Sequence, residues 1–212
     1  MAHSIYLTRC CYDPPAVTSR LAQQIEFILE IDRLKTVLRR TLLTDGSRNE
    51  NSAEHSWHLA LMALTLAEHS AAPLDVAHVV KLVLIHDLVE IDAGDTFCYD
   101  AEANVGKEER EQAAARRLFA LLPEDQAAEL HRLWEEFERR ETPEARFANA
   151  LDRLSPLLAN FATKGHSWRQ HGVVKSQVID RTSIIADGSA ELWDYIQERL
   201  DRAVADGILA DG

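Results

Sequence analysis

The stretch from Leu84 to Glu90 places three ionisable side chains, His86, Asp87 and Glu90, in an otherwise apolar segment. An ionised group buried without a partner is costly, so such groups are usually paired or bound to a metal ion. On a helix, His86 and Glu90 would share a face because they are four residues apart. His86 and Asp87 would lie about 100° apart around the axis, so an ion held by both needs further ligands from other helices.

Two more polar residues occur where the neighbouring side chains should point inward. His55 lies on the apolar face of a predicted amphipathic helix, and Asp152 lies within the apolar stretch 147–158. Aspartate is almost never fully buried without a partner. With the pair His86-Asp87 they make a set of two histidines and two carboxylates, which suits Mn, Fe, Co or Ni, with Zn possible. The alternative is a group of core histidines that are each hydrogen-bonded to a neighbouring carboxylate.

This order of residues, His … His-Asp … Asp, resembles the HD-domain metal-dependent phosphohydrolases. Within that family it is most similar to the 5′-deoxynucleotidases, which cleave deoxynucleoside 5′-monophosphates. The matching segments are Leu34–Arg39, Ser52–Ser56, His86–Glu90, Gly94-Asp95, Lys107–Glu109 and Ala150–Arg153. They lie within about residues 20 to 160 of the 212.

The resemblance implies a role for each matching residue. One divalent ion would be bound by His55, His86, Asp87 and Asp152. Glu90 and Asp95 would be catalytic carboxylates beside the ion, Arg39 would hold the substrate phosphate, and Lys107 would be a second phosphate contact. Arg40 follows Arg39 directly, so the choice between these two arginines stays open. Each of these roles has a structural alternative. Glu90 could be an exposed carboxylate at a helix end, and Asp95 could be a turn or cap residue. Arg39 and Lys107 could be solvated surface side chains.

Apolar residues recur at helical spacing along most of the chain, which predicts an all-α fold. Beyond an irregular start over residues 1–17, helices are expected over about 18–40, 52–72, 75–91, 107–122, 123–141, 142–163, 173–186 and 189–205. Ser52, Asp75 and the pair Thr142-Pro143 are helix-start signals, and Gly94 is a stop signal. Residues 44–51, 95–104 and 165–172 should be loops. No convincing strand pattern occurs.

The expected architecture is a single-domain HD-type helical bundle of about seven to eight helices over residues 1–212. Residues 20–160 would form the HD core. Residues 165–212 continue with many apolar side chains, which would either complete the core or form a subunit interface. The related nucleotidases are typically dimers, so the resemblance implies a homodimer.

Composition limits the classes of partner. The chain has 23 Lys and Arg against 35 Asp and Glu, a net charge of −12, which argues against binding a nucleic acid polymer. The three cysteines, Cys10, Cys11 and Cys98, do not form a disulfide framework and favour a reducing compartment. Neither a signal peptide nor an 18-residue apolar run is present, so a cytoplasmic protein without a membrane partner is expected.

Other functions remain as alternatives to a deoxynucleotidase. The same ligand set serves hydrolysis of guanosine tetraphosphate, nucleoside triphosphates and cyclic dinucleotides. The residues after His86-Asp87, Leu88-Val89-Glu90-Ile91, lack the glycine-lysine of the cyclic-dinucleotide enzymes and the glutamate-aspartate of the tetraphosphate enzymes. A non-catalytic helical module that binds a metal or a nucleotide is the alternative of a different class.

Overall fold

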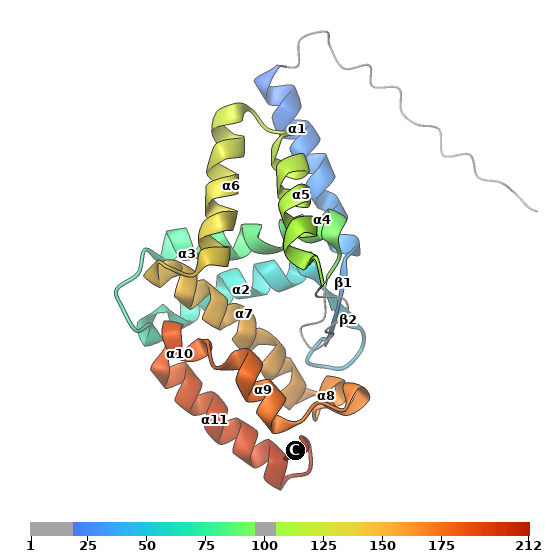
Figure 1. Cartoon of the computed structure of the whole chain (residues 1–212), viewed down its shortest axis with the longest axis vertical. Coiled ribbons are helices and arrows are strands. Elements are labelled where there is room, and N and C mark those ends of the chain that lie inside the picture. The colour runs from blue at the N-terminus through green and yellow to red at the C-terminus, as the bar shows by residue number, and fades with distance from the viewer. Residues whose placement is uncertain (1–18, 96–104) are drawn as a thin grey trace, which may run out of the picture.

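The computed structural model describes residues 19–95 and 105–212, which are mainly helical (Figure 1). The expected irregular start, the three cysteines and most of the loop after Gly94 lie outside these residues. The elements are α1 (Arg20–Ile31), a 3-10 helix (Asp32–Thr36), β1 (Leu38–Leu42), β2 (Asn49–Asn51), α2 (Ser52–Leu66), a 3-10 helix (Ala67–His69), α3 (Val76–Ile85), a 3-10 helix (His86–Val89), α4 (Glu90–Ala93), α5 (Lys107–Phe119), α6 (Glu124–Arg139), α7 (Pro143–Ala162), α8 (His166–His171), α9 (Lys175–Thr182), α10 (Ile185–Gly188) and α11 (Ala190–Ala205). The all-α class is confirmed.

A small β-hairpin replaces the end of the first predicted helix and the loop after it. The helix expected to reach residues 39–40 ends at Ile31, and β1 pairs with β2 in antiparallel register. The expectation of helix over β1 and of loop over β2 was therefore wrong. β1 contacts α7 and α8, which are more than 100 residues away in the chain, so tertiary packing overrides the local helical pattern here.

The starts of the next two helices place the first polar residues of the site. α2 begins with a capping box in which the Asn51 side chain accepts from the Glu54 backbone and Glu54 accepts from the Asn51 N–H; the cap lies one residue before the predicted Ser52. Asp75 caps α3 as predicted. α3 does not continue to Ile91, because the chain tightens into a 3-10 helix at His86–Val89 and then forms α4. A 3-10 segment inside a helix often marks a functional position.

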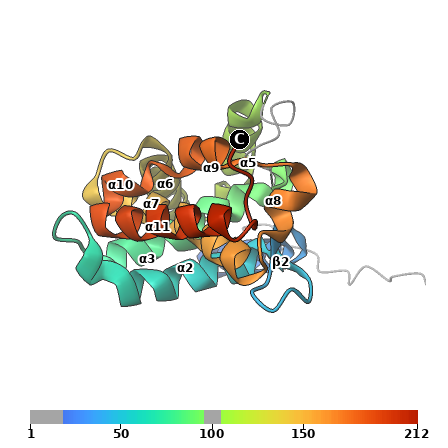
Figure 2. The same ribbon diagram turned by 90° about the horizontal axis from the view of Figure 1, so that it is seen from below.

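Helix α7 lies at the centre of the fold. Figure 1 shows α2 and α3 on one side of it and α9, α10 and α11 on the other, and in the view from below in Figure 2 α11 is nearest the viewer. It packs against α2, α3, α6, α9 and α10. Thr142 caps it and Pro143 is its first residue, as predicted. At Gly188, an added Cβ would lie 2.7 Å from the Ala150 Cβ, so α10 approaches α7 too closely for any larger residue.

The C-terminal part completes the core. Ile185, Ile196 and Leu200 are fully buried and belong to the hydrophobic core. The predicted loop 165–172 instead contains α8, a short helix between two glycines with left-handed backbone, and the helix predicted over 173–186 is divided into α9 and α10.

Helix α1 exposes most of its large apolar side chains. Leu21, Ile25, Ile28 and Leu29 are between 51% and 69% exposed, whereas Phe27 is buried. Among the described residues, no helix combines the length and the apolar character needed to cross a membrane.

Candidate metal centre

Three helical segments bring the predicted polar residues together. His55 lies in the first turn of α2, His86 and Asp87 begin the 3-10 helix after α3, and Asp152 lies midway along α7. One ligand atom each from His55, His86 and Asp152 can be chosen so that all three lie within 4.8 Å of one another. Asp87 joins them, since its Oδ1 is 3.0 Å from the His86 Nε2. All four residues are buried.

The surroundings of the two imidazoles fit a bound cation. His86 Nδ1 lies 2.8 Å from the Val83 carbonyl, so it must carry a hydrogen, while Nε2 faces Asp87 and, at 3.7 Å, Asp152. His55 has a carboxylate at each nitrogen: Asp152 Oδ1 at 3.0 Å from Nε2 and Glu50 Oε2 at 3.3 Å from Nδ1. A neutral imidazole has one lone pair, which would face a carboxylate in either tautomer. A proton or a metal ion removes that conflict.

Burial and charge act on these groups in opposite directions. Burial alone would lower the pKa of His86, but Asp87 and Asp152 raise it well above its usual range. Burial would raise the pKa of Asp87, yet His86 and Arg39 lower it to about 2. The carboxylates are therefore ionised at neutral pH, and a metal ion that binds them would displace a proton from His86.

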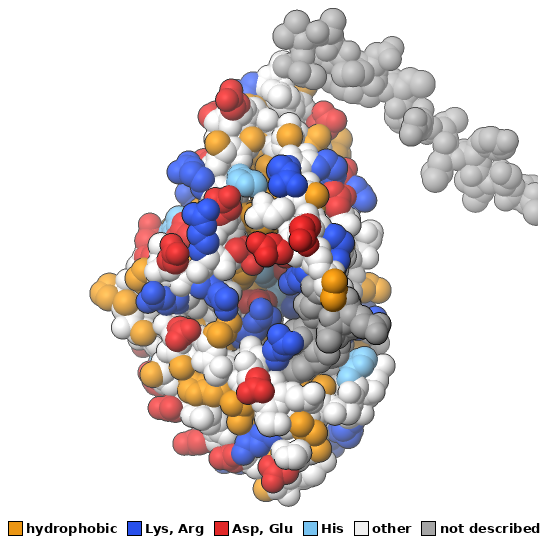
Figure 3. Space-filling model, in the orientation of Figure 1, with side chains coloured by type: hydrophobic (Ala, Val, Ile, Leu, Met, Phe, Trp, Pro, Cys, Tyr) orange, Lys and Arg blue, Asp and Glu red, His pale blue; other side chains and the backbone are white. Residues whose placement is uncertain are grey.

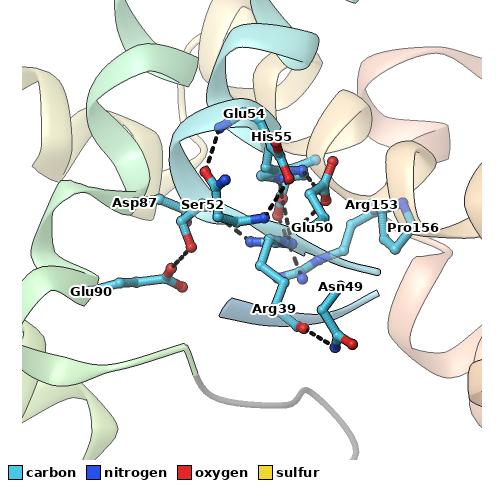
Figure 4. Close-up of polar contacts among 12 residues, drawn as sticks. Arg39, Asn49, Glu50, Ser52, Glu54, His55, Asp87, Glu90, Arg153 and Pro156 are labelled. Atoms are coloured by element: carbon cyan, nitrogen blue, oxygen red, sulfur yellow. Dashed lines mark hydrogen bonds and ion pairs between the residues drawn. The ribbon is translucent and has the colours of Figure 1, made fainter. Parts of the chain in front are cut away.

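Arg39 extends from β1 into the same cluster (Figure 4). Its Nη1 donates to Asp87 Oδ2 at 3.0 Å, and its Nη2 lies 4.0 Å from Asp152 Oδ1. The side chain is 13% exposed, so it is not a solvated surface arginine. Arg40, the other candidate, is exposed and lines the cavity described below.

Glu90 and Asp95 both line the cavity beside the cluster. The Ser52 hydroxyl donates to Glu90 Oε2 at 2.7 Å, and both residues are buried. Glu90 is 8% exposed and so is not an exposed helix-end residue. Burial and the nearby Asp87 carboxylate raise its pKa to about 8. Burial also raises the pKa of Asp95, which follows the left-handed Gly94 at the end of α4.

A cavity of about 220 Å³ opens beside these residues. Figure 3 shows acidic and basic side chains gathered around a hollow in this face of the molecule. The lining includes His86, Asp87, Asp152, Arg39, Glu90, Asp95 and Lys107, together with residues of α8 and α9. Lys107 is 40% exposed and lies 3.3 Å from Glu111, so it stands at the edge of the cavity rather than in the cluster.

Two buried residues of the site escaped the sequence analysis. Glu50 on β2 touches His55 and Arg39, and Ser52 at the start of α2 holds Glu90. Ser52 had been considered only as a helix cap. Glu50 lies in a polar stretch with no apolar periodicity, and only the pairing of β2 with β1 shows that it is buried.

Comparison with known proteins agrees with this geometry. A sequence model of the HD domain matches residues 31–193, more than half of the chain. The chain belongs to the HD-domain family. Among solved structures, the protein is similar to a predicted metal-dependent phosphohydrolase from Magnetospirillum magnetotacticum MS-1, with 55% identity, a TM-score of 0.88, and coverage of 93% of this chain and 100% of that one.

The curated relatives of this HD-domain protein carry a more specific name. It is 35% identical over 136 residues to the 5′-deoxynucleotidase HDDC2 of Bos taurus and 32% identical over 135 residues to that of Homo sapiens. The matches cover 63% of this chain, and the chain spans 64% and 65% of the length of these relatives.

Proposed function

We propose that this protein is a metal-dependent phosphohydrolase that removes the 5′-phosphate from deoxynucleoside monophosphates. One observation carries the proposal: two imidazole nitrogens, the carboxylates of Asp87 and Asp152, and the Arg39 guanidinium converge beside one cavity. The names of the relatives support the substrate class.

His55, His86, Asp87 and Asp152 would hold one divalent ion, with Mn, Co, Fe or Ni favoured by the nitrogen and oxygen donors. Such an ion, when bound, supplies a water of lowered pKa and polarises a phosphoryl oxygen. His86 is held for this task by its hydrogen bond to the Val83 carbonyl, which directs Nε2 toward the carboxylates.

Arg39 would neutralise the substrate phosphate, because its guanidinium lies beside the ligand carboxylates and is always charged. Glu90, buried beside the cluster and held by Ser52, would donate a proton to the leaving sugar oxygen. Asp95 would orient the attacking water from the loop after α4. Lys107 would add a weaker phosphate contact from the edge of the cavity.

The proposal also includes a two-fold homodimer. The C-terminal apolar residues are used in the core, so the exposed face of α1 is the surface we assign to the interface.

A substrate screen tests the function. The purified chain is stripped with a chelator, reloaded with Mn²⁺ or Co²⁺, and assayed for phosphate release from deoxy- and ribonucleoside mono-, di- and triphosphates and guanosine tetraphosphate. We expect turnover of deoxynucleoside monophosphates that requires the metal. Asp152→Ala should lose metal binding and turnover, whereas the control Glu198→Gln, on the exposed face of α11, should keep both. Thermal stabilisation by Co²⁺ without turnover of any nucleotide would refute the enzyme and favour a metal-binding module.

A further inference from the structure

Glu50 is a buried carboxylate that faces two buried nitrogen donors. Its Oε2 lies 3.3 Å from the Nδ1 of His55 and 3.5 Å from the Nε of Arg39, and Glu50 itself is 8% exposed. Neither of these nitrogens is accessible to water, and neither makes a hydrogen bond within the described part of the chain. A buried donor left without an acceptor is destabilising, so the nearby carboxylate is the acceptor that both nitrogens require.

The backbone fixes Glu50 between these two residues. β2 carries Glu50 and pairs with β1, which carries Arg39, and the Asn49 side chain donates to the Arg39 carbonyl at 2.6 Å. The capping box at Asn51 starts α2 directly afterwards, so His55 follows Glu50 by little more than one helical turn. Figure 4 shows Glu50 on the hairpin close to His55 and Arg39.

We propose that Glu50 is a positioning residue that couples the metal ligand to the phosphate-binding arginine. Its carboxylate accepts the Nδ1–H of His55, which leaves the Nε2 lone pair, on the side of Asp152, available to ligate a metal ion. The same oxygen accepts the Nε–H of Arg39, which turns the remaining guanidinium nitrogens toward Asp87 and the cavity. The part concerning His55 rests on the metal centre of the proposed function.

Metal affinity gives a readout that does not require turnover. Partners of this kind behind a ligating histidine typically contribute 10–100-fold to metal affinity. We expect Glu50→Ala to weaken Co²⁺ binding by 10–100-fold in calorimetric titration, and Glu50→Gln, which keeps one acceptor oxygen, to weaken it less. Circular dichroism establishes that each variant is folded.

Glu54→Gln is the matched control. Glu54 is a neighbouring carboxylate on the same segment, but it pairs with Arg48 and the Asn51 backbone and not with the cluster. Glutamine is compatible with the capping box, so α2 should start at the same residue. Co²⁺ affinity should be unchanged in this variant. Unchanged affinity in folded Glu50→Ala would overturn the role of Glu50 toward His55.

Inorganic phosphate tests the second contact. In the Co²⁺-loaded protein, Glu50→Gln should weaken phosphate binding, and it should have no further effect in an Arg39→Lys background, because lysine lacks the Nε–H that Glu50 accepts. Equal losses in both backgrounds would overturn the coupling. If no nucleotide is hydrolysed but Glu50→Ala still weakens Co²⁺ binding, the catalytic proposal fails while the positioning role stands.

Discussion

Glu90 is a carboxyl group whose surroundings oppose its ionisation. It is buried near Asp87, and its only hydrogen bond among the described residues comes from Ser52. In the metal-free protein its pKa is about 8, compared with 4.5 in its ordinary state. At a pH between 4.5 and about 8, Glu90 is ionised in the unfolded chain but protonated in the folded chain. Glu90 therefore makes the folded state less stable as the pH rises.

We therefore expect Glu90→Gln to stabilise the metal-free protein relative to wild type, more at pH 8 than at pH 5. Chemical denaturation at the two pH values measures the difference. Glu198→Gln, on an exposed face, should show no such dependence. In the metal-loaded protein, Glu90→Gln should retain metal but lose 10²–10⁴-fold in turnover, the usual contribution of a general acid. Equal stability differences at both pH values would contradict the raised pKa.

The start of α2 is the element that places His55. We expect Asn51→Ala to cost about 1 kcal/mol, because one helix-end N–H loses its acceptor, and to weaken Co²⁺ binding, because His55 lies in the first turn. Ser19→Ala removes the equivalent cap from α1. Thermal unfolding and calorimetry should show similar stability losses in both variants but weaker metal binding only in Asn51→Ala. Equal Co²⁺ affinities would show that the cap does not position the ligand.

Among the secondary-structure elements, sequence patterns predicted most helices but not the hairpin formed by β1 and β2. The caps at Asp75 and Thr142 are local signals that depend on a few adjacent residues, and both were correct. β1 depends on contacts with α7 and α8, which no local pattern contains. For the same reason Arg39 was expected on a helix although it lies on β1, and Glu50 was missed. His86 and Asp87 were identifiable because their apolar neighbours alone indicate burial.

For the whole molecule, the exposed apolar face of α1 makes the strongest prediction about assembly. Burying a large apolar side chain contributes roughly 1.5–3 kcal/mol, so an acidic substitution there should prevent a dimer from forming. We expect Ile25→Glu to be a folded monomer and wild type a dimer in light scattering at micromolar concentration. Tyr195→Glu, at a 49% exposed position on α11, should remain a dimer. A monomeric wild type, or a dimer disrupted only by Tyr195→Glu, would contradict the interface.

The contact of Gly188 with α7 also determines how the chain can be divided. A truncation after residue 163 would keep every residue matched to metal or phosphate, and by motif it would appear to be a complete unit. It would also strip α10 from the side of α7 where Phe147 and Ala150 are fully buried, and remove α8 and α9 from the wall of the cavity. Anyone preparing a minimal version of this protein should expect a shortened chain that aggregates, because α7 would lose the helices that cover this side of it.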